Sequence, residues 1–354
     1  MIKFFEKLKM KNIEKIPNSI SITWPGSKRR KCFAITVSEG KEFVVDWNDG
    51  SAPEKTTGTG KPQRMCHVYG NTRIYTIHII GTTEDCLLTY LSCSSGQITH
   101  IDASTNLALR ELWCGNNELT ELDVSANTEL KKLDCSENKI TALDVSANTK
   151  LECLSFFNNR ITDLDVSANT ILWRLWCSNN RITDLDLSAN TELLNLRCYG
   201  NRLSALDLKA NTLLKELWCS SNQLTMLNLE ANAELQNLRC FNNRLLLSDM
   251  YEASKMIEET AGKQLGTQTC IPQEIPVKSS VDYSAQMDIN NTTTDFDVEK
   301  NGKPASLSDY TITDGVITFH HIGSYKVTLT NEGIDSQTKY PAQVVAEFTV
   351  IAQE

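Results

Sequence analysis

The chain of 354 residues lacks the segments that mark membrane proteins and the motifs of common enzyme classes. No apolar run approaches the roughly 20 residues of a membrane-spanning helix. Residues 1–12 have no apolar core of a secretory signal peptide, and residues 348–354 contain no anchor or sorting motif. There is also no P-loop, G-x-G-x-x-G, G-x-S-x-G or H-E-x-x-H motif. We therefore expect a protein without a membrane span and without enzymatic activity.

Positive charge and histidine are scarce as well. The sequence has 35 Lys and Arg against 44 Asp and Glu, a net charge of −9 that argues against general nucleic-acid binding. No C-x-x-C pair is present, so we expect neither a zinc site of that kind nor any other cofactor. The five histidines do not fall at positions that would align them with a nucleophile: His67, His78, His100, His320 and His321.

One repeat of 21 residues dominates the sequence. Its marker residues are Cys93, Cys114, Cys135, Phe156, Cys177, Cys198, Cys219 and Cys240. A leucine precedes each marker by two positions, and from the second repeat on an asparagine follows it by three: Asn117, Asn138, Asn159, Asn180, Asn201, Asn222 and Asn243. An unbroken fixed period of this kind predicts a solenoid of stacked coils.

The order of residues within a repeat predicts its local structure. In Leu112-Trp113-Cys114 the alternation has period two, which indicates a short strand with Leu and Cys inward and Trp outward. Stacked strands would form a parallel sheet with a spacing of about 4.8 Å. We expect the Asn117 amide to bond to the backbone of the following turn. Aspartates and serines such as Asp123 and Ser125 would serve the opposite turn.

The pattern L-x-C-x-x-N-x-[IL], with its trailing L-D-V-S-x-N-T, resembles bacterial internalin-like leucine-rich repeat proteins, particularly the internalin J type, over residues 89–247. The resemblance implies a parallel sheet on a concave face, turns on a convex face, and a role in recognition or adhesion. It also implies an extracellular or cell-surface location. The absence of a signal segment from the chain keeps a cytoplasmic location as the alternative. We expect a monomer.

The cysteine ladder has three interpretations: small apolar core residues, disulfides, or a metal ladder. We favour core packing, because parallel neighbouring side chains are poorly oriented for disulfides and Phe156 replaces a thiol within the same frame. Five cysteines lie outside the ladder, and Cys66 beside His67 is a weak metal signal that we interpret as strand core. These five are Cys32, Cys66, Cys86, Cys153 and Cys270.

The segments on either side of the repeats are rich in predicted strands. The segment Asp46-Trp47-Asn48-Asp49-Gly50 resembles the hairpin of a polycystic-kidney-disease (PKD) type β-sandwich. Its Asp46, Asn48 and Asp49 have a calcium-ligand alternative, although their spacing misses the EF-hand order by one residue. The expected organisation is a lead segment (1–17), a PKD-like or Ig-like module (18–82), a solenoid of eight coils (83–247), a capping helix and linker (248–270) and an Ig-like module (271–354).

Binding residues are expected on the outward side of the strands, where side chains vary while the repeat frame does not. Tryptophan, tyrosine and arginine dominate binding hot spots, so the candidates are Trp113, Arg174, Trp176, Arg197, Tyr199, Trp218, Arg239 and Phe241. A protein ligand is the favoured partner, with carbohydrate binding, a structural spacer and simple shielding of the sheet as alternatives. A second row is interpreted as a solvated edge, with attraction of an acidic partner as its alternative: Lys139, Arg160, Arg181, Arg202 and Arg244.

Overall fold

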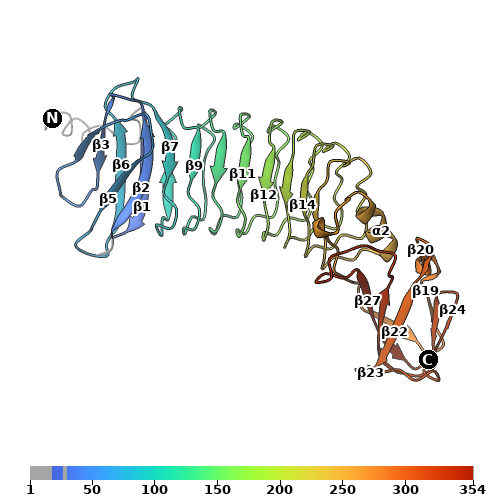
Figure 1. Ribbon diagram of the computed structural model, residues 1–354. Coiled ribbons are helices and arrows are strands. Elements are labelled where there is room, and N and C mark those ends of the chain that lie inside the picture. The colour runs from blue at the N-terminus through green and yellow to red at the C-terminus, as the bar shows by residue number, and fades with distance from the viewer. Residues whose placement is uncertain (1–17, 27–29, 354) are drawn as a thin grey trace. The chain divides into compact units, whose positions relative to one another are not determined.

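The computed structural model describes residues 18–26 and 30–353 (Figure 1). These residues belong to two compact units, Met1–Ile182 and Thr183–Glu354. The boundary falls inside the repeat region, so each unit contains several coils of the solenoid. The expected lead segment, residues 1–17, lies outside the described residues.

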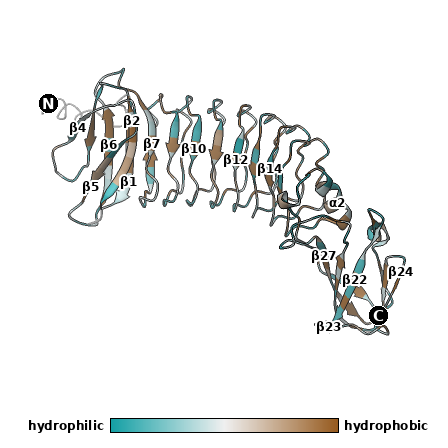
Figure 2. Ribbon diagram, in the orientation of Figure 1, coloured by the Kyte–Doolittle hydropathy of each residue, from teal (hydrophilic) through white to brown (hydrophobic). Residues whose placement is uncertain are grey.

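The first unit is built from two sheets. One has the order β4-β3-β6-β1-β8, and the other runs β5-β2-β7-β9-β10-β11-β12. Hydrophobic residues occupy much of β2 and β6 (Figure 2). The strands are β1 (Ser19–Pro25), β2 (Lys31–Val37), β3 (Glu42–Asp46), β4 (Glu54–Thr57), β5 (Gln63–His67), β6 (Ile74–Gly81), β7 (Leu88–Ser92), β8 (His100–Asp102), β9 (Glu111–Trp113), β10 (Lys132–Asp134), β11 (Cys153–Ser155) and β12 (Arg174–Trp176).

The N-terminal strands continue directly into the solenoid sheet. β2 pairs antiparallel with β5 on one side and with β7, the first coil strand, on the other. In the other sheet, β1 pairs antiparallel with β6 and with β8, which belongs to the first coil. Alternate residues of β1, Ile20, Ile22 and Trp24, are fully buried. The polar backbone edge of the first coil is therefore paired with strands from the start of the chain.

The coil strands of the first unit have the predicted parallel register. Leu91 lies beside Leu112, Leu112 beside Leu133, and the series continues through β12. Leu112 and Cys114 are fully buried while Trp113 between them is half-buried, which confirms the predicted orientation. The side facing away from the solenoid core, called the sheet face here, is formed by the outward residues of these strands.

Asparagines close the turns of the coils as the sequence predicts. The Asn117 Nδ2 donates to the Cys93 and Cys114 carbonyls, and its Oδ1 accepts from the Gly96 and Ile98 amides. On the opposite turn, the aspartates accept from the amide two residues later, as Asp123 Oδ1 does from Ser125. The backbone groups bonded to Asn117 are buried away from water, so its side chain must pair them, whereas the aspartate turn is exposed.

A second asparagine ladder was not predicted. Asn127 is fully buried, and its Nδ2 donates to the carbonyls of Ala103 and Asn106 at 3.1 and 2.8 Å. The same two bonds recur one coil later at Asn148. The 21-residue spacing of these asparagines is visible in the sequence, but their role depends on which carbonyls the turn brings to them.

The second unit begins with the parallel strands β13 (Asn195–Arg197), β14 (Glu216–Trp218), β15 (Asn237–Arg239) and β16 (Lys263–Gln264). The predicted helix is present as α2 (Leu247–Lys255), with Met250 and Ala253 buried. The remaining elements are η2 (Thr260–Gly262), β17 (Thr267–Thr269), β18 (Gln273–Pro276), β19 (Ser280–Asp282), η3 (Ser284–Gln286), β20 (Asp288–Ile289), β21 (Thr292–Thr293), β22 (Asp295–Lys300), β23 (Lys303–Pro304), β24 (Tyr310–Thr313), β25 (Val316–Phe319), β26 (Gly323–Thr330) and β27 (Gln343–Ile351).

Residues 263–268, expected to belong to a linker, form a further partial coil. Lys263 pairs with Leu238 at the position of the repeat leucine, and Leu265 is fully buried at the position of the ladder cysteine. Gln268 replaces the asparagine, because its Oε1 accepts from the Asn243 amide and its Nε2 donates to the Leu265 carbonyl. The α2 insertion stretches the spacing beyond 21 residues, which hides this coil from a period search.

The C-terminal strands form a larger sheet, β17-β27-β26-β22-β23 with β18 also paired to β27, a three-stranded sheet, β19-β25-β24, and the two-stranded ribbon β20-β21. Phe319 of the three-stranded sheet packs against Tyr325 and Phe348 of the larger one, with ring centroids 4.6 and 5.3 Å apart. The predicted hairpin turn between β24 and β25 is present, with positive φ at Asp314 and Gly315.

Candidate functional site

All eight candidate binding residues lie on or beside the coil strands and are half-buried. Each of the two compact units holds its own set of these side chains. The first unit carries Trp113, Arg174 and Trp176, and the second carries Arg197, Tyr199, Trp218, Arg239 and Phe241.

In the first unit, the aromatic side chains are held by charged neighbours. The Trp113 Nε1 donates to Glu111 at 3.1 Å, and the same carboxylate forms a 3.0 Å ion pair with Lys132 on the next strand. The Arg174 guanidinium lies over the rings of Trp173 and Trp176, 4.5 and 4.8 Å from their centroids. Arg174 thus lies against the electron-rich faces of two tryptophan rings, whereas Trp113 is held through the Glu111 carboxylate.

In the second unit, Trp218 is enclosed between two arginines from the strands on either side. The guanidinium carbons of Arg197 and Arg239 each lie 3.7 Å from the centroid of the Trp218 ring. Since two guanidinium groups cannot share one face at that distance, they cover opposite faces. The Arg197 Nε also donates to Glu216 at 2.6 Å. These three residues, Arg197, Trp218 and Arg239, are called the Arg–Trp–Arg stack.

Aromatic side chains flank the Arg–Trp–Arg stack. The Tyr199 ring lies 6.3 Å from that of Trp218. The Phe241 ring stacks on Tyr340, with centroids 5.3 Å apart and planes inclined by 14°. Gly266, at φ +59°, makes room for Phe241, because a Cβ there would lie 2.4 Å from the Phe241 Cβ. Sequence reasoning missed Tyr340 because it comes from a loop before β27, far from the repeats.

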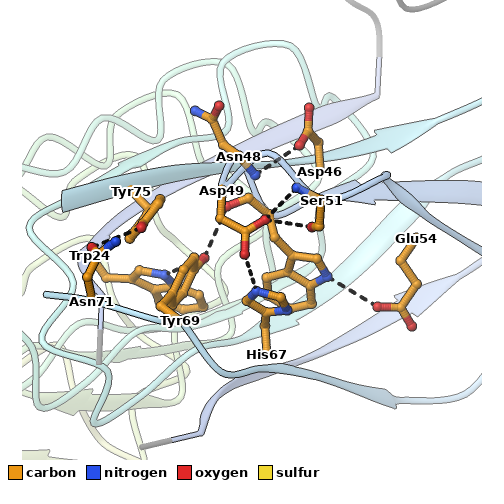
Figure 3. A network of polar contacts seen from close by, with 11 residues as sticks. Trp24, Asp46, Asn48, Asp49, Ser51, Glu54, His67, Tyr69, Asn71 and Tyr75 are labelled. Carbon is orange, nitrogen blue, oxygen red and sulfur yellow. Dashed lines mark hydrogen bonds and ion pairs between the residues drawn. The ribbon is translucent and has the colours of Figure 1, made fainter. Parts of the chain in front are cut away.

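In the hairpin of the N-terminal module, the aspartate carboxylates form hydrogen bonds to other groups of the same module (Figure 3). Asp46 accepts from the Asn48 amide, and Asp49 accepts from Ser51 and lies 2.7 Å from the His67 Nε2. The Ser51 hydroxyl, with help from His67, lowers the pKa of Asp49 to about 2. Within residues 18–26 and 30–353 no group of three or more His, Cys, Asp or Glu is arranged to hold a metal ion.

A row of stacked rings accompanies this hairpin. His67 stacks on Trp47 at 4.9 Å, and Tyr69 stacks on Tyr75 at 4.1 Å. The fully buried Tyr69 hydroxyl accepts from the Trp24 Nε1 and donates to the Trp47 carbonyl, and burial raises its pKa to about 12. The buried, internally bonded groups make this network part of the module's core.

The cysteines are of two kinds. Cys32 and Cys66, which pair directly across β2 and β5, form a disulfide. The interpretation of Cys66 as plain strand core is therefore incomplete, because its partner is set by a register that the sequence did not specify. The seven ladder cysteines are buried and not disulfide-bonded, and burial raises the pKa of Cys93 and Cys240 to about 12.

Comparisons with known proteins agree with this architecture. A family model described as leucine-rich repeats (two copies) matches residues 128–169. The functional domain of internalin J from Listeria monocytogenes, whose structure includes a cysteine ladder, is 24% identical with a TM-score of 0.55, covering 75% of this chain and 62% of that one. An internalin-like protein of the same organism is 18% identical with a TM-score of 0.47, covering 75% and 87%. No curated protein sequence matches the chain.

The fold and repeat frame are those of a leucine-rich repeat solenoid. In fold, this solenoid is similar to the internalin J domain, which also includes a cysteine ladder. The chain spans less than two thirds of that domain's length. In the part of the chain that the structure describes, no helix is both long and apolar enough to cross a membrane.

Proposed function

We propose that this protein is a non-enzymatic recognition protein that binds a protein ligand through the sheet face of its solenoid. Leucine-rich repeat proteins commonly serve protein binding, and the internalin-like fold belongs to this class. The observation that carries the proposal is the Arg–Trp–Arg stack on the sheet face. It holds tryptophan and arginine, which are among the residue types most enriched at binding hot spots, in a set arrangement on an outward surface.

The repeat frame does not require a tryptophan at this outward position. Three other coils have Ser92, Asp134 and Ser155 at the equivalent position and keep the same register, although Trp113 and Trp176 occupy it in two more. Trp218 therefore contributes apolar contact area that folding alone does not demand. The arginines stacked on it have already lost side-chain freedom, which lowers the entropic cost of binding.

Carbohydrate binding receives less support from the same geometry. A sugar ring binds tryptophan by stacking on a ring face, and both faces of Trp218 are covered by guanidinium groups. In the first unit, Arg174 lies over Trp173 and Trp176 as well. A sugar would have to displace an arginine to reach these faces, whereas a protein ligand can contact the ring edges and the arginine donors directly.

We place this recognition outside the cytoplasm, on the cell surface or in the extracellular space. The Cys32–Cys66 disulfide supports this location, because disulfides persist mainly in oxidising compartments. The buried ladder thiols are compatible with it, since burial protects them from oxidation.

The test is capture of biotinylated host-cell surface proteins by the whole chain, identified by mass spectrometry, beside a glycan array. The sheet-face variant carries Trp218→Ser and Arg239→Ser, and the matched control carries Lys209→Ser and Met226→Ser, both exposed and away from the sheet face. Circular dichroism and urea unfolding establish that both variants are folded.

The proposal expects one or a few captured proteins that are lost with the sheet-face variant and kept with the control. Equal capture by the sheet-face variant would move binding elsewhere and overturn the proposal. Glycan binding lost only in the sheet-face variant would replace the protein ligand with a carbohydrate. Absence of both activities in the wild type would leave a structural spacer.

A further inference from the structure

The second unit carries positive charge along one border of its sheet face, although the whole chain has a net charge of −9. This border follows the carboxyl ends of β13, β14 and β15. The stretches 197–204, 218–225 and 239–246 contain no aspartate or glutamate, and they carry four arginines: Arg197, Arg202, Arg239 and Arg244.

Most of these arginines have no carboxylate partner. Arg197 is paired with Glu216, which lies at the opposite end of its strand. Among the described residues no ion pair reaches Arg202, Arg239 or Arg244. Like charges that remain uncompensated on an acidic protein raise the electrostatic potential locally and favour an anionic partner.

A loop of the C-terminal module extends this border. The Gly266 amide donates to the Tyr340 carbonyl at 3.1 Å, and Tyr340 stacks on Phe241, so the loop is fixed beside the last coils. The loop's Asp335 is neutralised by the buried Lys263 at 2.8 Å. Lys339 is exposed next to Tyr340, and within the described part of the chain no carboxylate is paired with it.

Next to β15, the other border of the same sheet face is acidic. Beside Asn237, at the amino end of β15, a surface hollow is lined by the carboxylates Glu234, Glu258 and Glu259. Beside β15 the sheet face is therefore polarised across its width, and there an anionic ligand is repelled by the glutamates and attracted to the arginines.

We infer that the carboxyl-end border, defined by Arg197, Arg202, Arg239, Arg244 and Lys339, binds an extended acidic segment of the protein ligand. This inference rests on the proposed function and specifies its partner's chemistry. The Arg239 guanidinium, already oriented by Trp218, offers a fork of donors to a carboxylate. The rings of Tyr199, Phe241 and Tyr340 receive apolar side chains between the acidic ones.

A sulfated polysaccharide is the other anionic macromolecule that such a border could attract. It would use the cations alone, whereas half-buried rings alternate with the cations here. The observed mixture of apolar and cationic groups matches an acidic peptide better. Recognition in this mode combines charge-assisted hydrogen bonds with burial of aromatic rings.

The experiment selects from a displayed library of random 12-residue peptides on the whole chain and measures the affinity of single synthetic peptides by fluorescence anisotropy. The inference expects a bound pool enriched in Asp and Glu together with aromatic or aliphatic residues. Replacing the acidic residues of a selected peptide by amides should weaken binding about tenfold or more, with a strong dependence on salt.

Protein variants then locate the site. Arg239→Gln should weaken peptide binding about tenfold, and Lys339→Gln, which changes an exposed side chain, several-fold. Lys209→Gln is the matched control, since it removes the same charge from an exposed position outside the border. Tyr340→Ala should weaken the peptides that carry apolar residues more than purely acidic ones.

Three results would overturn the inference: a neutral or basic peptide pool, equal affinity for Arg239→Gln, or binding of heparin that depends on the border while acidic peptides fail to bind. None of these three results by itself contradicts the proposed function, which the capture experiment tests independently. If capture of a cell-surface protein depends on Trp218 while acidic peptides do not bind, the proposed function stands and the acidic-segment inference fails.

Discussion

Asn138 and Cys114 are joined across adjacent coils by a hydrogen bond of 3.1 Å from the Asn138 Nδ2 to the Cys114 carbonyl. The same carboxamide nitrogen donates to the Cys135 carbonyl, and its oxygen accepts from the Leu119 amide. One buried side chain thus pairs backbone groups of two coils.

We predict that Asn138→Ala lowers the free energy of unfolding by about 2–4 kcal/mol, because several buried backbone groups lose their partners at once. Urea denaturation followed by circular dichroism measures the change. Thr141→Ala, an exposed substitution in the same coil, is the control and should stay within about 0.5 kcal/mol. A loss below 1 kcal/mol in Asn138→Ala would mean that water reaches these groups.

Phe156 is a fully buried ring at a position where the other repeats have cysteine. Phe156→Cys restores the repeat frame, yet we predict that it destabilises the protein by about 2–4 kcal/mol, because the smaller thiol leaves a cavity. Phe156→Leu should cost less, since it removes less volume. Equal stability of Phe156→Cys and the wild type would show that the neighbouring coils close around the smaller side chain.

The free thiols should divide sharply in their reactivity. Cys153 and Cys270 are half-buried, whereas the other eight free cysteines are buried. With Ellman's reagent at pH 8, we predict slow labelling of these two in the native protein and labelling of all ten in urea. The ladder thiols stay protected because burial excludes the reagent, and burial also raises the pKa of Cys198 to about 12. Cys153→Ser should remove one native equivalent; labelling of ladder positions at the same rate would contradict the structure.

Asp49 should make folding depend on acid pH. Its pKa is lowered to about 2 in the folded chain, chiefly by the Ser51 hydroxyl, so its ionised form stabilises the fold. This contribution is fully present above the unfolded pKa of about 4 and is lost as the pH falls from about 4 towards 2. We expect about 1–2 kcal/mol, since the side chain retains some contact with water.

Carboxylate titration by NMR measures the Asp49 pKa directly, and unfolding at several pH values measures the linked stability. Ser51→Ala should raise the Asp49 pKa towards its ordinary value. Asp49→Asn should flatten the stability profile between pH 2 and 4 relative to the wild type. An unchanged profile in Asp49→Asn would assign the acid sensitivity to other carboxylates.

The repeat region was predictable because its pattern is local and is repeated. The residues that form each strand and its asparagine turn stand at fixed positions, as Leu112, Cys114 and Asn117 do, and every copy tests the same interpretation. The candidate binding residues could be placed on the sheet face for the same reason, because each stands at a fixed position within its repeat. How they interact could not be read from spacing, since the stacking of Arg197 and Arg239 on Trp218 depends on side-chain rotamers.

The features that escaped prediction depend on distant parts of the chain. The Cys32–Cys66 disulfide follows from the register of β2 with β5, which no periodicity specifies. The ninth, partial coil substitutes Lys263 and Gln268 for the usual leucine and asparagine and is displaced by the α2 insertion. Tyr340 reaches the sheet face only because its loop is anchored to that coil.

The antiparallel pairing of β2 with β7 has a consequence for how this protein can change in length. A parallel stack with an open first strand can grow by accepting another coil at that end, from its own chain or from a second molecule. Here the position is already taken by a strand of opposite direction. At this end the array is therefore closed, so a gain or loss of coils, in whole steps of 21 residues, has to occur between β7 and the later coils.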